Sequence, residues 1–595
     1  MAMSKTAKTL LIIGGILFSV VLVAVIGIAL LLEFSGKPSV AKNSVLVLKV
    51  SGDLPDYTPE DPLAKALGMG GGESFTGLLT QLRKAKVDER IGAVLIDIQF
   101  PQIGMAKADE LRDTIKDVRS SGKPVYAYME MGSNKDYYIA TACDKVFLPP
   151  SGDLAINGLA ANVMFYRGTL DKIGVEPEFI QIGKYKNAPD QYLRKDMADG
   201  QREVMNAILD DYFARMTNAI ADSRKKSPED VKAIIDNAPY NAIKAKELGL
   251  IDGAIYRDEL YNELKKTLGY DEKKELDLVS GSEYKEVPAS SLGLNNGAEV
   301  AVIYASGGIV SGKSSNGGFG GGGQMSGSDT LVSAINDATD DESIKAIILR
   351  VDSPGGSALA SDLMWHALEN AKAKKPIVVS MSDYAASGGY YISCNANKIV
   401  AEPSTLTGSI GMFTGKMNLK GLYNWAGVSN EYLLRGKNAG LYRESEKWTP
   451  EEHAKMVESA NTVYYDNFVP KVAKGRGKTA EEINAIGQGH VWTGFQAKDK
   501  GLVDEYGGLE KAIDIAKELA GLPAEKDVKR VVFPAPQPFF ETLLDSTNAS
   551  VKEETQKAMV ESLPKELQKT LRFAKMFELM NGQNMMLLPF EMEIK

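Results

Sequence analysis

The chain contains the same pattern twice, at a spacing of 253 residues. Residues 91–98 read IGAVLIDI and residues 344–351 read IKAIILRV, and both runs have the apolar, often β-branched composition of a buried strand. A helical stretch and a second apolar strand follow each run, and then come YYIA at Tyr137 and YYIS at Tyr390. Alternating strands and helices favour a largely parallel sheet. We therefore expect an α/β protein built by tandem duplication.

The repeat divides the 595 residues into four parts. Residues 288–298 and the glycine-rich residues 317–328 interrupt the periodicity, which is typical of a linker and a loop. The four expected parts are a tail and membrane anchor over 1–43, a first half over 44–292, a second half over 293–530 and a helical extension over 531–595.

One segment near the N-terminus has the composition of a transmembrane helix. Residues 9–32 are 24 consecutive uncharged residues, and about 20 helical residues cross a bilayer core. No small-residue cleavage site follows, which favours an uncleaved anchor. Lys5 and Lys8 precede the segment and Glu33 follows it, so the positive-inside rule predicts a cytoplasmic N-terminus. We expect a single-pass protein of the cytoplasmic (inner) membrane, with its body outside the cytoplasm.

Charge and ligand-forming residues make some functions improbable. The 69 Lys and Arg against 78 Asp and Glu give a net charge of −9, which argues against a nucleic-acid partner. With two cysteines and three histidines, the chain has no CxxC pair and no HExxH motif. The sequence therefore predicts neither a metal site nor a cofactor.

Comparison of the two copies places the candidate chemistry in the second half. There, the first strand ends in DSPGGS (352–357) and the second is followed by AASGGY (385–390). The first copy has Asn134 where the second has Ser387, and it lacks the paired glycines. Glycines permit close backbone approach, so the amides of Gly356 and Gly388 are candidates for stabilising an oxyanion beside a Ser387 nucleophile.

The base that would activate Ser387 is less obvious. His366 and His453 lie in helical patterns and His490 in a turn, which makes a Ser-His-Asp triad the weaker alternative. A lysine is the better candidate, provided that burial lowers the pKa of its amine.

These motifs carry a family resemblance. DSPGGS, AASGGYYIS and PSTLTGSIGM in the second half, GKYKNA in the first half, the duplication and the N-terminal anchor together resemble long-form bacterial signal peptide peptidase A, also called protease IV. The resemblance implies a Clp-protease-like or crotonase-like fold in each half and a homo-oligomer, expected to be a tetramer. It also implies that Ser387 is the nucleophile, that Lys186 is the general base and that Ser409 orients the lysine.

Lys437 competes with Lys186 as the base, because RGKNA around Lys437 is similar to GKYKNA around Lys186. In short members of the resembled family, neighbouring subunits bring a serine and a lysine together. A tandem duplication would put the first half in the neighbour's place, so Lys186 would serve Ser387, and Lys437 would meet Asn134. On this argument Lys186 is the base and Lys184 a flanking charge.

The resemblance implies a membrane-anchored serine endopeptidase that degrades cleaved signal peptides without a cofactor. Two alternatives come from other classes. A crotonase-like acyl-CoA enzyme would use paired backbone amides without needing a serine and a lysine. A non-catalytic membrane scaffold would fit the degenerate first half.

Overall fold

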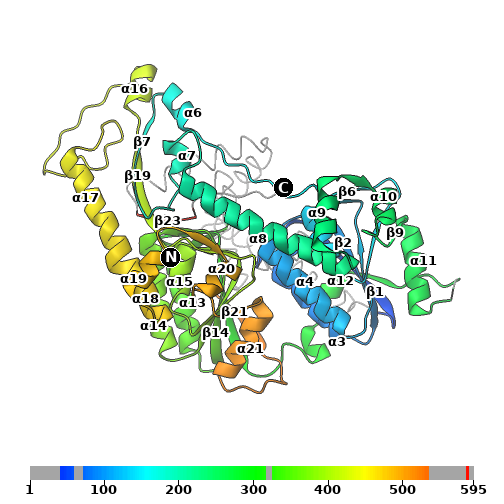
Figure 1. The fold of residues 1–595 in the computed structure, drawn as a ribbon. Helices are drawn as coiled ribbons and strands as arrows, with labels where there is room; N and C mark the ends of the chain where they lie inside the picture. The colour runs from blue at the N-terminus through cyan, green and yellow to red at the C-terminus, as the bar shows by residue number, and fades with distance from the viewer. Residues whose placement is uncertain (1–39, 59–71, 272, 316–323, 535–583, 589–595) are drawn as a thin grey trace, which may run out of the picture.

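The computed structural model describes residues 40–58, 72–271, 273–315, 324–534 and 584–588. Two α/β halves follow one another along the chain, coloured from blue to green and from green to orange in Figure 1. The prediction of an α/β fold is confirmed. No helix within the described ranges is long and apolar enough to cross a membrane, and the anchor expected over 9–32 lies outside them.

The first half is built on a parallel six-stranded sheet with the order β10-β1-β2-β3-β5-β9. Its strands are β1 (Ser44–Asp53), β2 (Ile91–Gln102), β3 (Val125–Tyr128), β5 (Lys145–Leu148), β9 (Gly253–Ala254) and β10 (Leu278–Ser280). A small sheet beside it contains β4 (Met131–Ser133), β6 (Asp153–Ala155) and β8 (Tyr240–Asn241). The main helices are α3 (Phe75–Val87), α4 (Met105–Ser120), α5 (Asn134–Ala140), α6 (Arg167–Lys172), α8 (Asp199–Arg224) and α11 (Arg257–Leu268).

The second half is built on an eight-stranded sheet. Its main path, β20-β18-β16-β14-β11-β22, carries β17 and β21 at its side. The strands are β11 (Glu299–Ser306), β14 (Ile344–Ser353), β16 (Ile377–Ala386), β17 (Lys398–Ala401), β18 (Leu406–Gly408), β20 (Val491–Thr493), β21 (Glu505–Tyr506) and β22 (Lys529–Phe533). The main helices are α13 (Ser328–Asp340), α14 (Ala358–Lys372), α15 (Gly388–Ser393), α16 (Lys420–Ala426), α17 (Pro450–Asn461), α18 (Val469–Arg476) and α21 (Leu509–Leu519).

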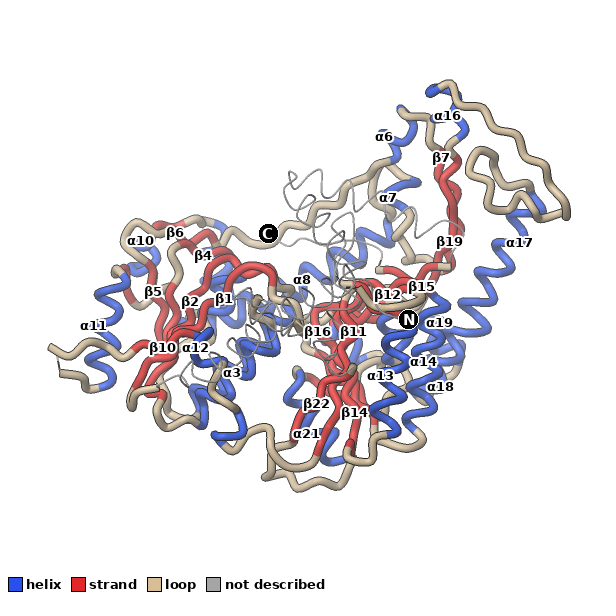
Figure 2. The backbone as a smooth tube through the Cα atoms, turned by 180° about the vertical axis from the view of Figure 1, so that it is seen from behind, coloured by secondary structure: helices blue, strands red, loops and turns tan. Residues whose placement is uncertain are grey.

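A third sheet joins segments that are far apart in the chain. Its order is β13-β12-β15-β23-β19-β7. Only β7 (Glu176–Ile182) comes from the first half, and it pairs antiparallel with β19 (Met412–Asn418) along its whole length. The other strands are β12 (Gly308–Val310), β13 (Met325–Gly327), β15 (Gly355–Ser357) and β23 (Met585–Leu587). Because β7 pairs with a strand of the second half, the residues that follow β7 also lie against the second half (Figures 1 and 2).

The duplication is visible element by element. Helices α4 and α14 begin 253 residues apart, and so do β5 and β17, β6 and β18, and α6 and α16. Even single hydrogen bonds repeat: the Tyr166 amide donates to the Gln191 carbonyl, and the Leu419 amide donates to the Glu444 carbonyl, both over 2.6 Å. Strand β7 is an exception to this repeat, because the corresponding residues 429–435 of the second half form no strand.

Buried charges join the halves. Arg350 on β14 is fully buried, and one of its terminal nitrogens donates to Asp56 over 2.9 Å and to Glu110 on α4 over 2.7 Å. Lys107 on α4 pairs with Asp352 over 2.8 Å. Helix α8 also crosses between the halves (Figure 1), where the Tyr212 hydroxyl donates to the Ser404 carbonyl. These contacts hold the first half in a fixed position against the second.

The extension expected to be helical over 531–595 needs a correction. Its described residues form strands: β22 spans the expected boundary at residue 530, and β23 lies in the third sheet. Both runs are short and find backbone partners in existing sheets: β22 pairs with β11 at the edge of its sheet, and β23 pairs with β15 and β19. Residues 535–583 lie outside the described part of the chain.

Candidate active site

Ser387 lies at the sharp turn between β16 and α15. It is fully buried and has the positive φ of 55° that a residue with a side chain seldom adopts. Its amide donates to the Gly408 carbonyl, and its carbonyl accepts from the Tyr391 amide, each over 2.8 Å. The strained turn is therefore held from both sides, in a way typical of a nucleophile at a strand-to-helix junction.

Lys186 reaches Ser387 from the other half of the chain. Strand β7 ends at Ile182, and the following turn is held to the second half by the Tyr185 amide, which donates to the Gln488 carbonyl. Gly489 lies so close that a Cβ there would come within 2.5 Å of the Lys186 amide nitrogen. At the end of this path, Lys186 Nζ lies 2.7 Å from Ser387 Oγ.

The environment of Lys186 favours a neutral amine. The side chain is fully buried, and desolvation lowers the pKa of the amine well below its usual range. Its partners are hydroxyl and carbonyl oxygens: Nζ lies 2.7 Å from Ser387 Oγ, 2.9 Å from Ser409 Oγ and 3.2 Å from the Ser409 carbonyl oxygen. Among the described residues, no carboxylate forms an ion pair with Lys186 to restore its charge.

Ser409 is positioned to orient the lysine. It follows β18, has a positive φ of 48°, and its amide donates to the His490 carbonyl over 2.8 Å. Its side chain and its carbonyl both contact Lys186 Nζ, whereas Ser387 contacts that nitrogen through Oγ. The two oxygen atoms of Ser409 therefore hold the Lys186 amine beside Ser387 Oγ.

The two candidate oxyanion amides lie side by side. A Cβ added to Gly388 would come within 3.1 Å of the Gly356 amide nitrogen. Gly355 and Gly356 have φ values of 104° and 158°, the first of which only glycine adopts readily. Paired amides beside a nucleophilic hydroxyl can bind the oxygen of a tetrahedral intermediate.

The C-terminal strand β23 lies against these amides. It pairs antiparallel with β15, with Met586 opposite Gly356, and it also pairs with β19. The Ala358 amide donates to the Asn584 carbonyl over 3.0 Å, and the Leu588 amide donates to the Pro354 carbonyl over 2.8 Å. A Cβ on Gly355 would lie 1.9 Å from the Met586 carbonyl oxygen and 2.7 Å from the Gly388 amide nitrogen. The Met586 carbonyl therefore borders the space that an oxyanion would occupy.

The sequence pattern of peptidase family S49 matches this chain in two stretches of equal length, residues 117–271 and 369–523. The chain belongs to peptidase family S49. The two matches confirm the tandem duplication, and the family identifies the chain as a serine peptidase that hydrolyses peptide bonds.

Relatives resemble this S49 peptidase over most of its length. It is 36% identical to the chloroplastic serine protease SPPA of Arabidopsis thaliana over 86% of this chain and 74% of the relative. It is 33% identical to Protease 4 of Salmonella typhi, over 85% of this chain and 83% of that one. The expected resemblance to the long form of signal peptide peptidase A is confirmed. A ClpP1 variant from Listeria monocytogenes aligns in structure over 36% of this chain and 93% of its own, at 14% identity and a TM-score of 0.23.

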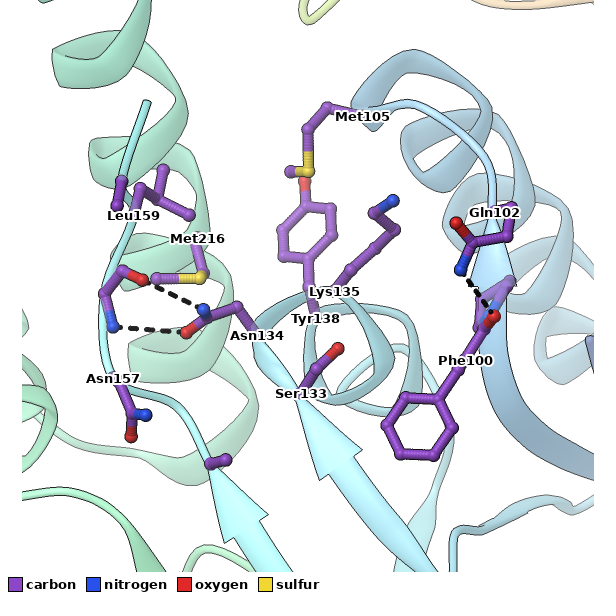
Figure 3. Close-up of a pocket in the computed structure, with 14 residues that line it drawn as sticks. Phe100, Gln102, Met105, Ser133, Asn134, Lys135, Tyr138, Asn157, Leu159 and Met216 are labelled. Atoms are coloured by element: carbon purple, nitrogen blue, oxygen red, sulfur yellow. Dashed lines mark hydrogen bonds between the residues drawn. The ribbon is translucent and has the colours of Figure 1, made fainter. Parts of the chain in front are cut away.

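The first half of this S49 peptidase has a pocket around Asn134, the residue that corresponds to Ser387. The pocket has a volume of about 510 Å³ and is lined by Asn134, Met105, Leu159 and Met216 among others. Figure 3 shows the Asn134 side chain between helix α5 and the segment at Gly158, where its amide donates to the Gly158 carbonyl over 2.9 Å. An amide held in this way is not a nucleophile.

Among the residues that the structure describes, none of the other candidate bases forms a hydrogen bond with Ser387. His490 is stacked on Trp492, and burial lowers the pKa of its ring to about 4. His366 contacts Asn370 on the exposed side of α14, and His453 lies on α17. Lys437 belongs to an exposed segment, and Lys184 contacts Tyr185 and Glu203 at the surface. In the described part of the chain, no cluster of His, Cys, Asp and Glu could hold a metal ion.

Sequence reasoning missed the part that β23 plays. The run MMLLP near the C-terminus is apolar, but its position between β15 and β19 depends on contacts with residues more than 170 positions away. The available signal was a short apolar run inside the extension expected to be helical, and the sequence alone did not indicate which strands it would pair with.

Proposed function

We propose that this S49 peptidase is a membrane-anchored endopeptidase that cleaves apolar peptides, such as signal peptides already released from their preproteins, through a Ser387-Lys186 dyad. The observation that carries the proposal is the distance of 2.7 Å between Lys186 Nζ and Ser387 Oγ, together with the complete burial of both side chains. A neutral lysine at this distance can act as a general base.

The proposed reaction has two stages. Neutral Lys186 takes the proton of Ser387 while Oγ attacks the peptide carbonyl carbon, and the amides of Gly356 and Gly388 bind the resulting oxyanion. Lys186 then donates that proton to the leaving amine, and the C–N bond breaks to leave an acyl-enzyme. A water molecule, deprotonated by Lys186, attacks the ester and releases the peptide acid, and the proton returns to Ser387.

Strand β23 supports an extended, apolar peptide as the substrate. Its backbone pairs with β15, and its side chains Met585 and Met586 are 5% and 1% exposed. Recognition of a peptide by strand addition uses backbone hydrogen bonds for affinity and alternate side-chain pockets for selection. A substrate strand in the same position would present its carbonyl to the Gly356 and Gly388 amides.

The membrane location rests on the uncharged residues 9–32 and on the resemblance to signal peptide peptidases. The acyl-CoA and scaffold alternatives have no support from the comparisons, because those comparisons identify a peptidase.

Hydrolysis of a synthetic signal-peptide sequence by the full chain in detergent tests the proposal. Wild-type protein should cleave the peptide, and Ser387→Ala should not. Ser393→Ala is the matched control, because Ser393 is also fully buried and its hydroxyl donates to the Gly389 carbonyl instead. Equal turnover by Ser387→Ala and wild type would overturn the proposal.

A further inference from the structure

The pocket around Asn134 corresponds in position to the groove that holds β23. Fourteen residues line the pocket, and their counterparts 253 positions later include Ser387. Four further counterparts contact β23 through their backbones: Pro354, Gly355, Ala358 and Phe413. The pocket residues at these four positions are Pro101, Gln102, Met105 and Ala160. The pocket is therefore the first-half counterpart of a groove that contains an extended apolar strand.

In the first half this space is open. The pocket has a volume of about 510 Å³. In the described part of the chain, no strand pairs with residues 156–166, which correspond to β19 and its flanks. Figure 3 shows Leu159 and Met216 on one side of the space and Phe100 and Gln102 on the other. An extended peptide could enter between these two sides, as β23 does between β15 and β19.

The walls of the pocket suit apolar side chains. Leu159 and Met216 contribute apolar groups, and methionine adapts its shape to irregular apolar partners. Asn134 directs both ends of its amide at Gly158: Nδ2 donates to the carbonyl over 2.9 Å, and Oδ1 accepts from the amide over 3.3 Å. Pockets with apolar walls and a few fixed polar groups are typical binding sites. The ligand is therefore expected to be as apolar as Met585 and Met586 of β23, which are almost fully buried in their groove.

Phe100 in the pocket lining provides an independent observation. It has a φ of 50°, which is strained for a residue with a bulky side chain, and it is 51% exposed. Its counterpart Ser353 is fully buried and is absent from the residues of positive φ. The first half therefore presents a strained, exposed aromatic ring where the second half has a small buried residue. A peptide packed against this ring would bury its apolar surface.

We infer that the pocket is a second peptide-binding site, which holds an extended apolar peptide without cutting it. Asn134 stands in the place of the Ser387 nucleophile, and Ile156 stands in the place of Ser409. At both of these positions the hydroxyl is missing, so the bound peptide stays intact. The class of peptide rests on the proposed function, whereas the shape and the walls of the pocket do not.

Helix α8 connects the pocket to the catalytic half. Met216, which lines the pocket, belongs to this helix. One turn earlier, the Tyr212 hydroxyl donates to the Ser404 carbonyl of the second half over 2.6 Å. A peptide bound in the pocket is therefore held close to the half that cuts, at a high effective concentration. The chain has one groove for cutting an apolar peptide and one for retaining it.

Photo-crosslinking to the full-length Ser387→Ala protein in detergent tests the inference. The probe is the synthetic signal-peptide sequence with photoreactive diazirine analogues at its leucines, and mass spectrometry locates each cross-link. Labelling should appear in the first half, within residues 100–105 or 157–160 or at Met216, and an excess of unmodified peptide should suppress it. Labelling confined to the second half would overturn the inference. Peptide hydrolysis by the wild type, measured in parallel, distinguishes a failure of the proposed function from a failure of this site.

Two variants add a readout that is specific to the pocket. Ala160→Trp places a large side chain at an exposed position of the lining, and Phe100→Ala removes the exposed ring. Both proteins should fold, and first-half labelling should fall at least about tenfold in each. Ala233→Trp is the matched control, because Ala233 is also exposed but belongs to helix α9 (Pro228–Asp236), outside the lining. Unchanged labelling in both pocket variants, or an equal loss in the control, would contradict the site.

A p-benzoylphenylalanine in place of Phe100 distinguishes the peptide from other occupants. On irradiation it should cross-link to the added peptide. A cross-link to another segment of the same chain or to a second copy, persisting at saturating peptide, would show that the pocket is filled by the protein itself and would overturn the inference.

Discussion

At the scale of single residues, the proposed activity depends on the charge of one amine. Lys186 is buried, its amine contacts hydroxyl and carbonyl oxygens, and no carboxylate among the residues that the structure describes forms an ion pair with it. Burial therefore disfavours its charged form, and the pKa of the amine is lowered. A neutral amine can accept the proton of Ser387 at a pH where an exposed lysine is almost fully protonated.

The lowered pKa of Lys186 predicts an acid-side loss of activity. The neutral amine is the base, so kcat/KM should fall tenfold per pH unit below the pKa of Lys186 and level off above it. Because the unfolded chain binds this proton at higher pH than the folded chain, the free energy of unfolding should rise with pH between the two pKa values. In Lys186→Met, the corresponding pH dependence of the melting temperature should be reduced; an identical dependence would count against a neutral Lys186.

Substitution of Ser409 by alanine should slow the reaction without abolishing it. Ser409→Ala removes one contact to Lys186 Nζ, at 2.9 Å, and leaves the carbonyl contact and Ser387 Oγ in place. We expect kcat/KM to fall by up to about 10-fold, the effect of losing one net hydrogen bond. Peptide hydrolysis measures this change in kcat/KM, and the rate of covalent labelling by a serine-directed reagent measures the reactivity of the serine itself. Complete loss of labelling in Ser409→Ala, with labelling kept in Ser387→Ala, would reverse the two roles.

At the scale of elements, β23 lies where a substrate strand is proposed to lie. A tethered segment competes at a high effective concentration. Deletion of residues 584–595 should therefore lower the KM for a peptide substrate several-fold, with the melting temperature measured in parallel. A synthetic peptide with the sequence NMMLLP, added to the truncated protein, should restore inhibition. A higher KM after truncation, or no inhibition by the peptide, would show that β23 stabilises the substrate-binding strands β15 and β19 and does not occupy the substrate's position.

The sequence predicted the elements around the site better than the segments that complete it. Strands and helices follow from local periodicity, and the duplication follows from the pattern that recurs after 253 residues. Comparison of the two copies indicated Ser387 as the candidate nucleophile, because the first copy has Asn134 at that position. The paired amides of Gly356 and Gly388 followed from glycine chemistry. The proximity of Lys186 to Ser387 came from the resemblance and the duplication argument, because 201 residues separate them in the chain. The helical expectation over 531–595 was wrong for β22 and β23, whose conformation is set by neighbouring strands.

At the scale of the whole molecule, the candidate site exists only while the two halves keep their relative position. Lys186 belongs to one half and Ser387 to the other. Arg350 binds Asp56 and Glu110 across the junction, with all three side chains buried. Stability of this junction and catalytic activity should therefore change together.

Arg350→Met should destabilise the protein and reduce its peptidase activity. The substitution leaves two buried carboxyl groups without their cation, a change that typically costs about 3–5 kcal/mol. Lys374→Met is the control, because Lys374 and its partner Asp340 are 62% and 71% exposed and such pairs contribute about 0–1 kcal/mol. Urea unfolding and peptide hydrolysis provide the two readouts. A variant as stable as wild type would show that the junction does not depend on this cluster.

The most direct test of the central claim is the rate at which a fluorophosphonate modifies Ser387, measured by mass spectrometry in wild type, Lys186→Met and Lys437→Met. A dyad formed by Ser387 and Lys186 predicts a loss of about 10²-fold to 10⁴-fold in Lys186→Met, the usual contribution of a general base. Lys437→Met should react at close to the wild-type rate, because Lys437 lies in the exposed segment between α16 and α17. Rapid modification of Ser387 in Lys186→Met, with loss of modification in Lys437→Met, would contradict the assignment of Lys186 as the base that activates Ser387.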